Sequence, residues 1–502
     1  MTIAEMLRRA AEEDGARTAL VCERRRWSYA GLWRAARGAA TLLRESGARS
    51  VALLDGNGEA GAIALFGAAL AGVPFTPLNY RRADADIAAL LDRIAPAWLI
   101  AGNDRAAQLG QAAGAIVSTP AAFVAAAQAA PPVTINGDHQ GVAVQIFTSG
   151  TTGAPKAALL RHAHLQAYIA ATATPAKASP PEGSLVSVPP YHVANVVAVL
   201  TAIHARRRLL LLPAFDAAAW LRLAEMERPS YAFVVPTMLA RILDRIDDPA
   251  LAPLPTLTAL SYGAGPMPPA LLERALACFP DVRFTNAYGL TETCATITSL
   301  TPEDHRAALA SADPAMRARL RSAGRPLPGI EIEVRDGAGR ALAAGQRGEV
   351  HARGVQVSGE YHDRDARDAD GWFATRDLGW RDSDGYLFLA GRADDVIVRG
   401  GENISPGEIE AVLLTHPAVA EACAVGLPSP EWGESIGAAL VLRPGHPAPQ
   451  AAEMQALVKA RLHSSHVPER IAVLDALPYN DLGKLLRREV RASPLLRTAS
   501  SL

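Results

Sequence analysis

Short apolar runs that alternate with helical stretches constrain the fold of this chain more than any other feature of its sequence. Such runs fall at Thr18–Cys22, Ser50–Leu54 and Ala97–Ala101, and stretches with a helical pattern separate them. Strands that alternate with helices form parallel sheets whose faces the helices cover. The order therefore predicts an α/β fold, a sandwich built on parallel strands.

The sequence pattern changes after Gly329. Residues 330–334 and 348–352 alternate apolar and polar side chains, and a turn at Asp336-Gly337 lies between them. A period of two indicates strands with one buried face. We therefore expect an antiparallel β region in this part of the chain.

The length of the chain, 502 residues, exceeds that of one ordinary hydrophobic core. The segment Ala393–Asp395 precedes a compact run of short helices and strands. We predict a large N-terminal domain, residues 1–392, made of α/β sandwich subdomains plus the β region. A small α+β domain, residues 393–502, would follow it.

Charge and hydropathy exclude several classes of function. The formal net charge is −1, which argues against a nucleic-acid or anionic-membrane binder that relies on bulk charge. The N-terminal segment mixes acidic and basic residues and predicts a surface helix rather than a signal peptide. The most apolar stretch, residues 188–203, is interrupted by His192 and Asn195 and is short for a bilayer. We expect no membrane span.

The cysteines indicate a reducing compartment. They are far apart and form no Cys-x-x-Cys pair, so neither a zinc knuckle nor a disulfide framework is indicated. The four are Cys22, Cys278, Cys294 and Cys423. We therefore predict a cytoplasmic protein.

A loop rich in hydroxyls and glycines follows the apolar run at residues 142–147. It consists of Thr148, Ser149, Gly150, Thr151, Thr152 and Gly153, with Pro155 and Lys156 after it. Backbone N–H groups, hydroxyls and a cation suit a phosphate, and the glycines allow close approach. The spacing is not that of the Walker loop. The alternative is a hydrophilic turn after a strand.

Lysine is rare in this chain. It occurs at Lys156, Lys177, Lys459 and Lys484, and the other 46 of the 50 basic residues are arginine. A lysine in this chain therefore occurs either by chance or because a compact point charge is needed that arginine cannot supply. Lys484 in a glycine-containing turn would be a mobile cation suited to the charge that develops at phosphorus, rather than an ordinary exposed lysine.

Three further stretches carry side chains suited to a nucleotide. In residues 286–293, Tyr288 can lie against a base, Thr291 can donate to a phosphate, and Glu292 can hold a hard cation such as Mg²⁺. The alternative is a capped helix N-terminus. Asp377 can accept the hydroxyls of a ribose, unless it forms an Asx-turn. Arg392 can pair with phosphate or ribose, unless it forms a surface ion pair.

Six segments, in this order and spacing, resemble the adenylate-forming superfamily of acyl-CoA and aryl-CoA synthetases, luciferase and peptide synthetase adenylation domains. The resemblance covers nearly the whole chain. The segments are residues 148–156, 190–192, 286–293, 375–379, 391–404 and 480–485. It implies that a carboxylate attacks the α-phosphate of ATP to give acyl-AMP and pyrophosphate. The small domain then rotates, and a thiol takes the acyl group.

The resemblance also assigns roles to single residues. It implies that the loop from Thr148 to Lys156 holds the β- and γ-phosphates, that Glu292 is the Mg²⁺-associated acid, and that Lys484 bridges carboxylate and α-phosphate. Tyr288 would stack on adenine, and Asp377 and Arg392 would bind the ribose. The other positions assigned to the nucleotide are Gly263, Ala264, Gly265, Asn286, Ala287, Gly289 and Thr291.

For the second half-reaction the resemblance points to a hinge and a thiol channel. Asp394 stands at the position of the hinge. Gly400 and Gly401 resemble the strip beside which pantetheine threads, and Trp432 would pack against CoA. Arg376 departs from the family pattern, which has glycine before the ribose-binding acid. Arg399 and Gly400 stand near where luciferase carries a lysine, which counts against a luciferase.

The predicted substrate is an aryl or aliphatic carboxylate. His192 resembles the gate beside the acyl pocket, and residues 191–197 carry no acid to balance an amino acid's ammonium. The pocket candidates are small and apolar, although core packing uses such residues too. They are Val193, Ala194, Gly263, Ala264, Ala287 and Gly289, beside His192.

The sequence predicts an ATP-dependent acid–thiol ligase, with CoA as the simpler thiol. No carrier domain follows Leu502, so the thiol partner is expected to be external. One alternative is a free-standing ligase that loads an acyl or peptidyl carrier protein. Another is a catalytically silent paralogue that acts as a binding protein. The presence of candidate catalytic and nucleotide-binding residues argues against it, namely Lys156, Lys484, Glu292 and Asp377. Monomer and homodimer both remain open.

Overall fold

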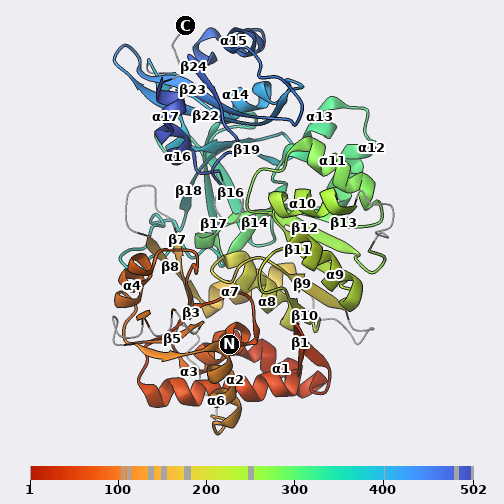
Figure 1. Cartoon of the computed structure of the whole chain (residues 1–502), viewed down its shortest axis with the longest axis vertical. Helices are drawn as coiled ribbons and strands as arrows, with labels where there is room; N and C mark the ends of the chain where they lie inside the picture. The colour runs from red at the N-terminus through yellow and green to blue at the C-terminus, as the bar shows by residue number, and fades with distance from the viewer. Residues whose placement is uncertain are drawn as a thin grey trace. The chain divides into compact units, whose positions relative to one another are not determined.

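The computed structural model describes residues 2–102, 105, 108–109, 115–133, 141–148, 155–173, 182–246, 254–400, 402–479 and 485–498 (Figure 1). The chain forms two units. The first comprises Met1–Ile332 and Ala352–Phe373, and the second comprises Glu333–His351 and Ala374–Leu502. This grouping does not test the predicted boundary between residues 392 and 393, which stays a prediction.

The first unit contains a six-stranded sheet in its described part. Its order is β6 (Ile116–Ser118), β5 (Ala97–Ala101), β3 (Ser50–Leu54), β4 (Phe75–Pro77), β7 (Val142–Thr148) and β8 (Lys156–Arg161). The strands from β6 to β7 pair in parallel, and β8 pairs antiparallel with β7. The alanine-rich composition of residues 108–130 predicts a helix and a connector. Strand β6 lies within this range and corrects that prediction.

A nine-stranded sheet forms the second layer of strands in this unit. Its order is β15 (Arg325–Pro326), β14 (Ala295–Leu300), β13 (Arg283–Leu290), β12 (Ala259–Gly263), β11 (Tyr231–Val234), β9 (Gly183–Val186), β10 (Arg208–Leu211), β1 (Thr18–Cys22) and β2 (Arg25–Ser28). The strands from β13 to β1 are parallel, with antiparallel strands at both edges. The predicted parallel strands are therefore present.

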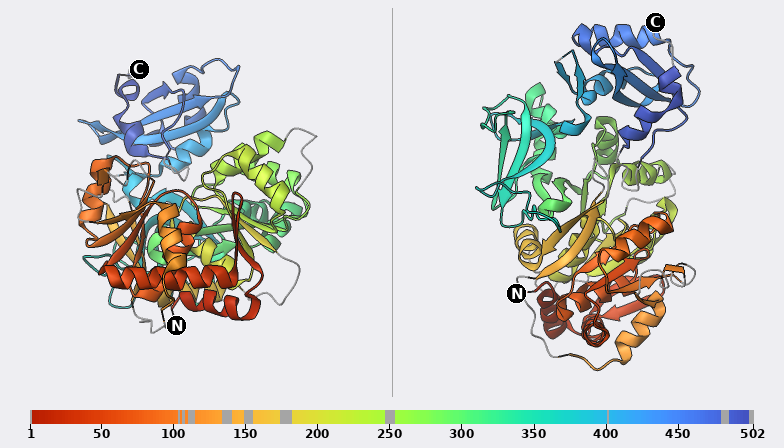
Figure 2. Two further views of the ribbon diagram at one scale, coloured as in Figure 1. Left: turned by 60° about the horizontal axis from the view of Figure 1, so that its bottom comes forward. Right: turned by 90° about the vertical axis from the view of Figure 1, so that its left-hand side faces the viewer.

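Helices cover these sheets. They are α1 (Ala4–Asp14), α2 (Tyr29–Ser46), α3 (Glu59–Ala71), α4 (Asp84–Asp92), α6 (Pro120–Ala129), α7 (His162–Thr172), α8 (Val193–His204), α9 (Ala217–Glu227), α10 (Pro236–Ile246), α11 (Pro269–Cys278), α12 (Pro302–Ala310) and α13 (Pro314–Ala318). Helix α2 packs against α1, α3 and α6, and these helices form the red-to-orange layer in Figures 1 and 2.

Small residues allow close packing within this helical layer. The side chain of Ser28 accepts a hydrogen bond from the Gly31 amide and begins α2, and Gly47 ends it in the left-handed conformation. A Cβ added at Gly67 of α3 would lie 2.7 Å from the Ala39 Cβ of α2. Any larger residue at that position would push the two helices apart.

The second unit contains most of the residues of a four-stranded sheet and all of a five-stranded one. The first has the order β16 (Ile330–Arg335), β17 (Gly348–Gly354), β18 (Phe373–Arg381) and β19 (Leu387–Arg392). The second has the order β21 (Glu402–Ile404), β20 (Ile397–Arg399), β23 (Gly433–Leu442) and β22 (Val419–Ser429), and β24 (Arg470–Val473) pairs with β23. The β region predicted after Gly329 is thus observed.

Helices pack on the five-stranded sheet and bury a core of its own. They are α14 (Pro406–Leu413), α15 (Ala451–Lys459), α16 (Arg487–Ala492) and α17 (Pro494–Thr498), drawn in blue in Figure 2. Ile397, Ile409 and Leu440 are fully buried in one cluster, and Cys423 and Val490 lie in another. This part of the chain therefore has hydrophobic clusters that its own helices and strands supply.

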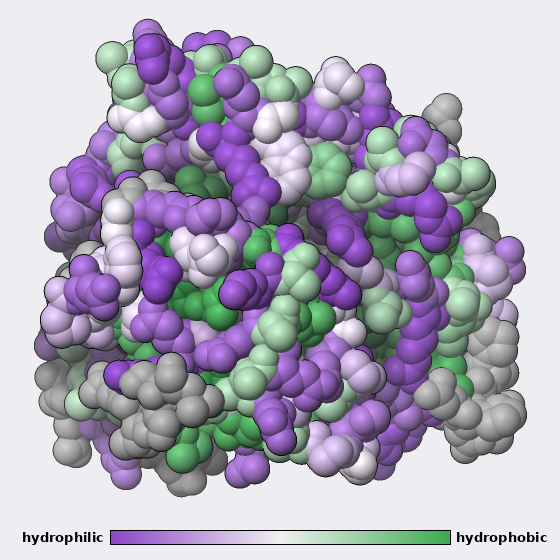
Figure 3. All heavy atoms as spheres, turned by 90° about the horizontal axis from the view of Figure 1, so that it is seen from above, coloured by the Kyte–Doolittle hydropathy of each residue, from purple (hydrophilic) through white to green (hydrophobic). Residues whose placement is uncertain are grey.

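The helices and the surface were compared with what a bilayer-spanning segment requires. No helix in the described residues combines the length and apolar character needed to cross a membrane. On the face shown in Figure 3, hydrophilic residues predominate and hydrophobic ones form small areas between them.

Candidate active site

The two strands that flank the predicted phosphate loop in the sequence pair with each other. Strands β7 and β8 are antiparallel, and Thr148 at the end of β7 is paired with Lys156 at the start of β8. The Thr148 hydroxyl donates a hydrogen bond of 3.4 Å to the Lys156 carbonyl. The remaining loop residues of the prediction, Ser149, Gly150, Thr151, Thr152 and Gly153, lie outside the described residues.

The predicted metal-associated acid is buried in a single 3-10 turn, η1 (Thr291–Thr293). The Thr293 hydroxyl accepts from the Leu290 amide at 2.9 Å and thereby closes the turn. The side chain of Glu292 is 8% exposed, and its Oε1 accepts a hydrogen bond of 2.8 Å from the Tyr361 hydroxyl. One buried carboxylate fits Mg²⁺ that arrives with ATP, because such an ion takes most of its oxygen ligands from phosphates and water.

A segment that the sequence analysis missed joins this turn to the hairpin. Tyr361 forms a β-bridge with Ala158, and the Gly359 amide donates to the Glu292 carbonyl at 2.9 Å. The Lys156 Nζ lies 5.8 Å from the centroid of the Tyr361 ring. The fold therefore brings Lys156 and Glu292 to the same tyrosine. In the sequence, the only indication of a functional role for Tyr361 is its position among the polar residues of 359–363.

The segment 286–293 is mostly strand. Its sequence predicts a loop that follows a strand at residues 282–285, and the structure corrects this. Strand β13 continues to Leu290, where it pairs antiparallel with β14. Tyr288 therefore lies in a strand opposite Thr298 rather than in a turn. The Asn286 Nδ2 donates to the Ser322 carbonyl at 3.0 Å. The predicted contacts of Asn286, Tyr288 and Thr291 with a nucleotide stay predictions.

Close strand packing explains two of the predicted pocket glycines. Gly263, at the end of β12, is paired with Ala287 in β13. A Cβ added at Gly263 would lie 2.2 Å from the Ala287 carbonyl oxygen, and one at Gly289 would lie 1.6 Å from the Ala295 carbonyl oxygen. Ala264 follows with φ of 65°, a left-handed turn away from the strand that leads to Gly265. Packing thus requires these glycines whether or not they line a pocket.

The predicted gate, His192, occupies the position immediately before the first turn of α8. Its ring centroid lies 4.4 Å from that of Tyr191, which contacts Tyr80 edge-on at 5.4 Å. Val193 and Ala194 form the first turn of the helix. The three predicted residues are therefore contiguous and half-buried, beside an aromatic cluster.

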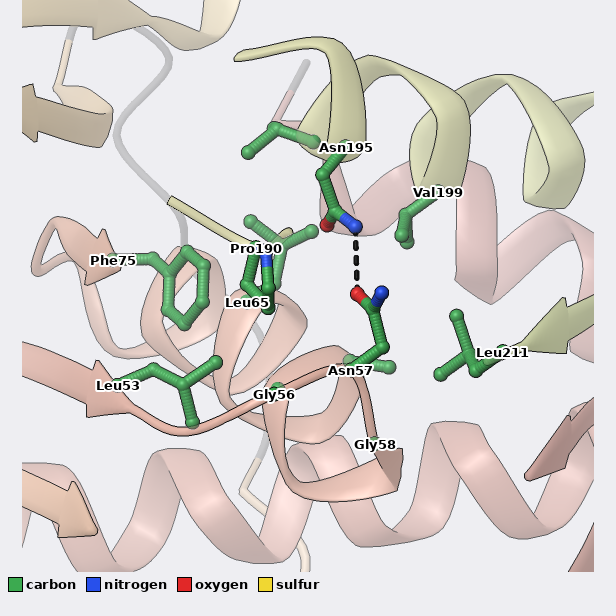
Figure 4. A pocket seen from close by; sticks show the side chains of 13 residues that line it. Leu53, Gly56, Asn57, Gly58, Leu65, Phe75, Pro190, Asn195, Val199 and Leu211 are labelled. Atoms are coloured by element: carbon green, nitrogen blue, oxygen red, sulfur yellow. Dashed lines mark hydrogen bonds between the residues drawn. The ribbon is translucent and has the colours of Figure 1, made fainter. Parts of the chain in front are cut away.

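A small cavity behind this helix is distinct from the predicted acyl pocket. In Figure 4 the Asn195 side chain donates to the Asn57 Oδ1 at 2.7 Å, and apolar side chains surround the pair. The Asn57 Nδ2 also donates to the carbonyls of Val188 and Leu212, each at 3.0 Å. The accessible volume, about 20 Å³, suits a water molecule and excludes a carboxylic acid substrate. The asparagines thus tie the two sheets of this unit together.

The two predicted ribose ligands lie side by side in the second unit. Asp377 in β18 is paired with Arg392 in β19, and the Arg392 Nη1 lies 3.3 Å from the Asp377 Oδ1. Asp377 is 8% exposed. Its neighbour Arg376 has φ of 62°, the conformation that favours the family's glycine at this position. The substitution therefore leaves the backbone turn intact, at a cost in strain.

The predicted hinge and thiol strip also belong to the second unit. The Arg376 guanidinium donates to the Asp394 Oδ1 at 2.9 Å. The Gly400 amide donates to the Trp432 carbonyl at 2.8 Å, and φ of Gly400 is 58°. The Trp432 side chain is 42% exposed. Gly401 and Lys484 lie outside the described residues. The hinge and CoA roles stay predictions.

One group of side chains within the described ranges is spaced to hold a metal ion, and it is not at the predicted site. It consists of Glu402, His463 and His466, whose ligand atoms lie within 4.8 Å of one another. The Nδ1 of His463 accepts from the Ser465 amide at 3.3 Å. Both ring nitrogens of His466 also have partners, because Nδ1 lies 3.1 Å from the Ser465 Oγ and Nε2 lies 3.6 Å from the Glu408 Oε2, and we assign no ion to this group.

Comparison with known proteins decides the family. The AMP-binding enzyme family matches residues 7–362, and the AMP-binding enzyme C-terminal domain matches residues 408–484. The chain belongs to the AMP-binding enzymes. The predicted membership of the adenylate-forming superfamily is confirmed.

Curated relatives of this AMP-binding enzyme are ligases. A fatty acid–[acyl-carrier-protein] ligase of Streptomyces coeruleorubidus is 32% identical, covering 96% of this chain and 94% of the relative. A feruloyl-CoA synthase of an Amycolatopsis species is 33% identical, covering 92% and 93%. A 2-succinylbenzoate–CoA ligase of Bacillus licheniformis is 34% identical over 72% and 73%.

Solved structures share the fold. The o-succinylbenzoate CoA synthetase of Bacillus subtilis, in complex with an acyl-adenylate intermediate, has a TM-score of 0.84 at 27% identity, covering 98% of both chains. The same enzyme with ATP and magnesium has a TM-score of 0.82 at 27% identity, covering 97% of this chain and 99% of the other. The predicted fold class, a large α/β domain with a small C-terminal domain, is confirmed.

Proposed function

We propose that this enzyme activates an aryl or aliphatic carboxylate with ATP and transfers the acyl group to the thiol of CoA. The observation that carries the proposal is the meeting of Lys156 and Glu292 at Tyr361, a cation and an acid suited to polyphosphate and its metal. The more general prediction, an AMP-forming acid–thiol ligase, is confirmed by the family and by the ligases among its relatives.

In the first half-reaction a carboxylate oxygen attacks the α-phosphorus, and the bond to the pyrophosphate oxygen breaks. Mg²⁺, when bound with ATP, neutralises charge on the phosphates. Lys156 and the loop from Thr148 hold the leaving pyrophosphate, and Glu292 orients the metal. Lys484 places a cation at the attacking carboxylate and the α-phosphate. Positively charged side chains held in place stabilise the negative charge that develops at the α-phosphate during the reaction.

Asp377 and Arg392 orient the nucleoside. A buried carboxylate accepts hydrogen bonds from both ribose hydroxyls, and the adjacent guanidinium fixes its position. Tyr288 stacks on the adenine, beside Gly263, Ala264 and Gly265 of the neighbouring strand end. Ligands in such sheets gather at the carboxyl ends of strands, which is where β12 ends.

In the second half-reaction the thiol sulfur attacks the acyl carbon, and AMP leaves with its phosphate oxygen. CoA is the proposed thiol, threading beside Gly400 and Gly401 with Trp432 against it. A carrier protein is the second candidate. It is favoured by the similarity to an acyl-carrier-protein ligase over nearly the whole chain. We also propose Mg²⁺ as the metal, a cytoplasmic location, and a monomer or homodimer.

Two observations support the proposed class of carboxylic acid substrate. They are the lack of a counter-charge for an amino group and the acyl groups in the names of the relatives. Residues 191–197 carry no carboxylate, so an ammonium group near His192 would be costly to bury. Succinylbenzoate, feruloyl and fatty acyl groups occur in the names of the relatives. We therefore expect an aryl or aliphatic acid without an α-amino group.

The test is a panel of aryl, short, long and polycyclic carboxylates, assayed for thioester formation with CoA and with holo carrier protein. We expect at least one acid without an amino group to give acyl-CoA. Adenylate formation with thioester only on the carrier protein would favour the second candidate. Activity confined to amino acids would contradict the proposed substrate class.

A further inference from the structure

The Tyr361 side chain contacts one acidic residue and two basic ones. The Arg364 Cζ lies 5.7 Å from the centroid of the Tyr361 ring, and the other two contacts are with residues distant in the sequence. The Tyr361 hydroxyl donates to the Glu292 Oε1 at 2.8 Å, and the ring centroid lies 5.8 Å from the Lys156 Nζ. A cation attracts an aromatic ring face at separations up to about 6 Å. One side chain therefore makes a polar contact with the acid and a cation–π contact with the lysine.

The backbone around Tyr361 fixes this position from two sides. On the hairpin side, Tyr361 bridges to Ala158, and the His362 amide donates to the Ala157 carbonyl at 3.1 Å. On the other side, the Gly359 amide donates to the Glu292 carbonyl at 2.9 Å. The tyrosine is thus held by main-chain bonds to β8 and to η1.

An ion pair directly between the lysine and the acid would cancel the charges that phosphate and metal require. Within the described residues, Lys156 and Glu292 form no ion pair with each other, and Tyr361 gives each a partner of another kind. Among the residues that the structure describes, the Tyr361 hydroxyl bonds to Oε1 of Glu292, which leaves the second carboxylate oxygen to a cation.

We propose that Tyr361 is a positioning residue for MgATP. Its hydroxyl holds the Glu292 carboxylate in the orientation that receives the metal, and its ring keeps Lys156 directed along the hairpin. The inference rests on the proposed function, since it names what prepares that site for its nucleotide. Tyr361 would thus contribute to ATP affinity in two ways. The contribution of its hydroxyl depends on the metal, and the contribution of its ring depends on the phosphates.

Calorimetric titration of the full chain with ATP, at several Mg²⁺ concentrations and without metal, tests the proposal without turnover. Tyr361→Phe keeps the ring and removes the hydroxyl. We expect its MgATP affinity to fall about tenfold, while its affinity for metal-free ATP stays that of the wild type. Tyr361→Leu should weaken both affinities, because the cation–π contact is lost as well.

The matched control is Tyr29→Phe. Tyr29 is fully buried in the same unit, and its hydroxyl donates to the Arg207 carbonyl at 3.0 Å. We expect this variant to bind MgATP as the wild type does. An equal loss of MgATP affinity in Tyr29→Phe and Tyr361→Phe would overturn the inference, because any buried hydroxyl would then have the same effect.

A double variant provides the second test. In a Glu292→Gln background, Tyr361→Phe should no longer change the Mg²⁺ dependence, because the metal-binding charge is already absent. Persistence of the effect would overturn the inference and leave the proposed function standing. The inference would also be overturned if ATP binding by Tyr361→Phe depended on Mg²⁺ as it does in the wild type. Failure of the wild-type chain to bind MgATP at all would overturn both.

Discussion

Arg376 shows how one residue can depart from a family pattern without abolishing the local structure. It adopts φ of 62°, and its guanidinium reaches Asp394 at 2.9 Å. The left-handed conformation costs a residue with a Cβ roughly 1–2 kcal/mol. The side chain of Arg376 is 57% exposed, so its ion pair recovers little of that cost.

This strain gives a prediction that distinguishes backbone from side chain. Arg376→Ala loses the ion pair and keeps the strained φ, whereas Arg376→Gly loses the pair and relieves the strain. We expect the glycine variant to be about 1 kcal/mol more stable than the alanine variant. Urea unfolding of both measures the difference. Equal stabilities would show that φ at this position carries no cost.

The charge of Glu292 is the second feature that belongs to the residue scale. Glu292→Gln retains an Oε1 that can accept the Tyr361 hydrogen bond, but it removes the negative charge. We predict a fall of about 100-fold in carboxylate-dependent pyrophosphate release, with little change in thermal stability. An assay over a range of Mg²⁺ concentrations checks it. Full activity at ordinary Mg²⁺ would remove Glu292 from the metal site.

The sequence could identify Lys156 and Glu292 but not Tyr361. Lysine is rare in this chain, so each one draws notice, and Glu292 lies in a recognisable segment. Tyr361 is one of ten tyrosines and has no local pattern of its own. Its role follows from contacts with residues 69 or more positions away, which only the folded chain brings together.

At the scale of elements, continuous apolar runs were predicted best. The strands β1, β3 and β5 begin and end at the predicted residues. Turn residues mark some of these ends, since Asp55-Gly56 follow β3 and Pro96 and Gly102 flank β5. The three-residue β6 was missed, since its alanine-rich surroundings favour a helix. The extension of β13 was missed because Asn286 and Gly289 are typical turn residues, whereas pairing with β14 decides their conformation.

Gly289 provides the prediction for this strand pair. A Cβ there would meet the Ala295 carbonyl oxygen at 1.6 Å, so β13 and β14 would have to separate. We expect Gly289→Ala to lower the free energy of unfolding by about 3 kcal/mol. Gly102→Ala is the control, because a Cβ at Gly102 has no neighbour within 4 Å. Denaturant unfolding of both variants should show a loss only for Gly289→Ala.

At the scale of the whole molecule, buried histidines make stability depend on pH. Burial lowers the pKa of His305, His164 and His204. The His305 Nδ1 donates to the Thr301 carbonyl at 2.7 Å, and its Nε2 accepts from the Tyr262 hydroxyl at 2.9 Å. The neutral ring therefore satisfies both partners, whereas a proton on Nε2 would prevent the Tyr262 hydroxyl from donating to it.

The sign of the effect follows from proton binding. Since the folded-state pKa values are lower than that of a free histidine, the unfolded chain binds more protons as the pH falls below about 6.5. The contribution of these histidines to the free energy of unfolding is fully present above that pH, and it is lost as the pH falls below it. We predict a lower melting temperature at pH 5.5 than at pH 7.5, and a smaller difference in His305→Gln. An unchanged difference would exclude His305 as a contributor.

The central claim is that one chain adenylates a carboxylate and then transfers it to a thiol, with Lys484 needed for the first step. Carboxylate-dependent exchange of labelled pyrophosphate into ATP measures the first step, and thioester formation from supplied acyl-AMP measures the second. We predict exchange in the wild type, and in Lys484→Ala a loss of exchange with thioester formation largely retained. No exchange in the wild type with any acid, or equal loss of both steps in the variant, would contradict the account.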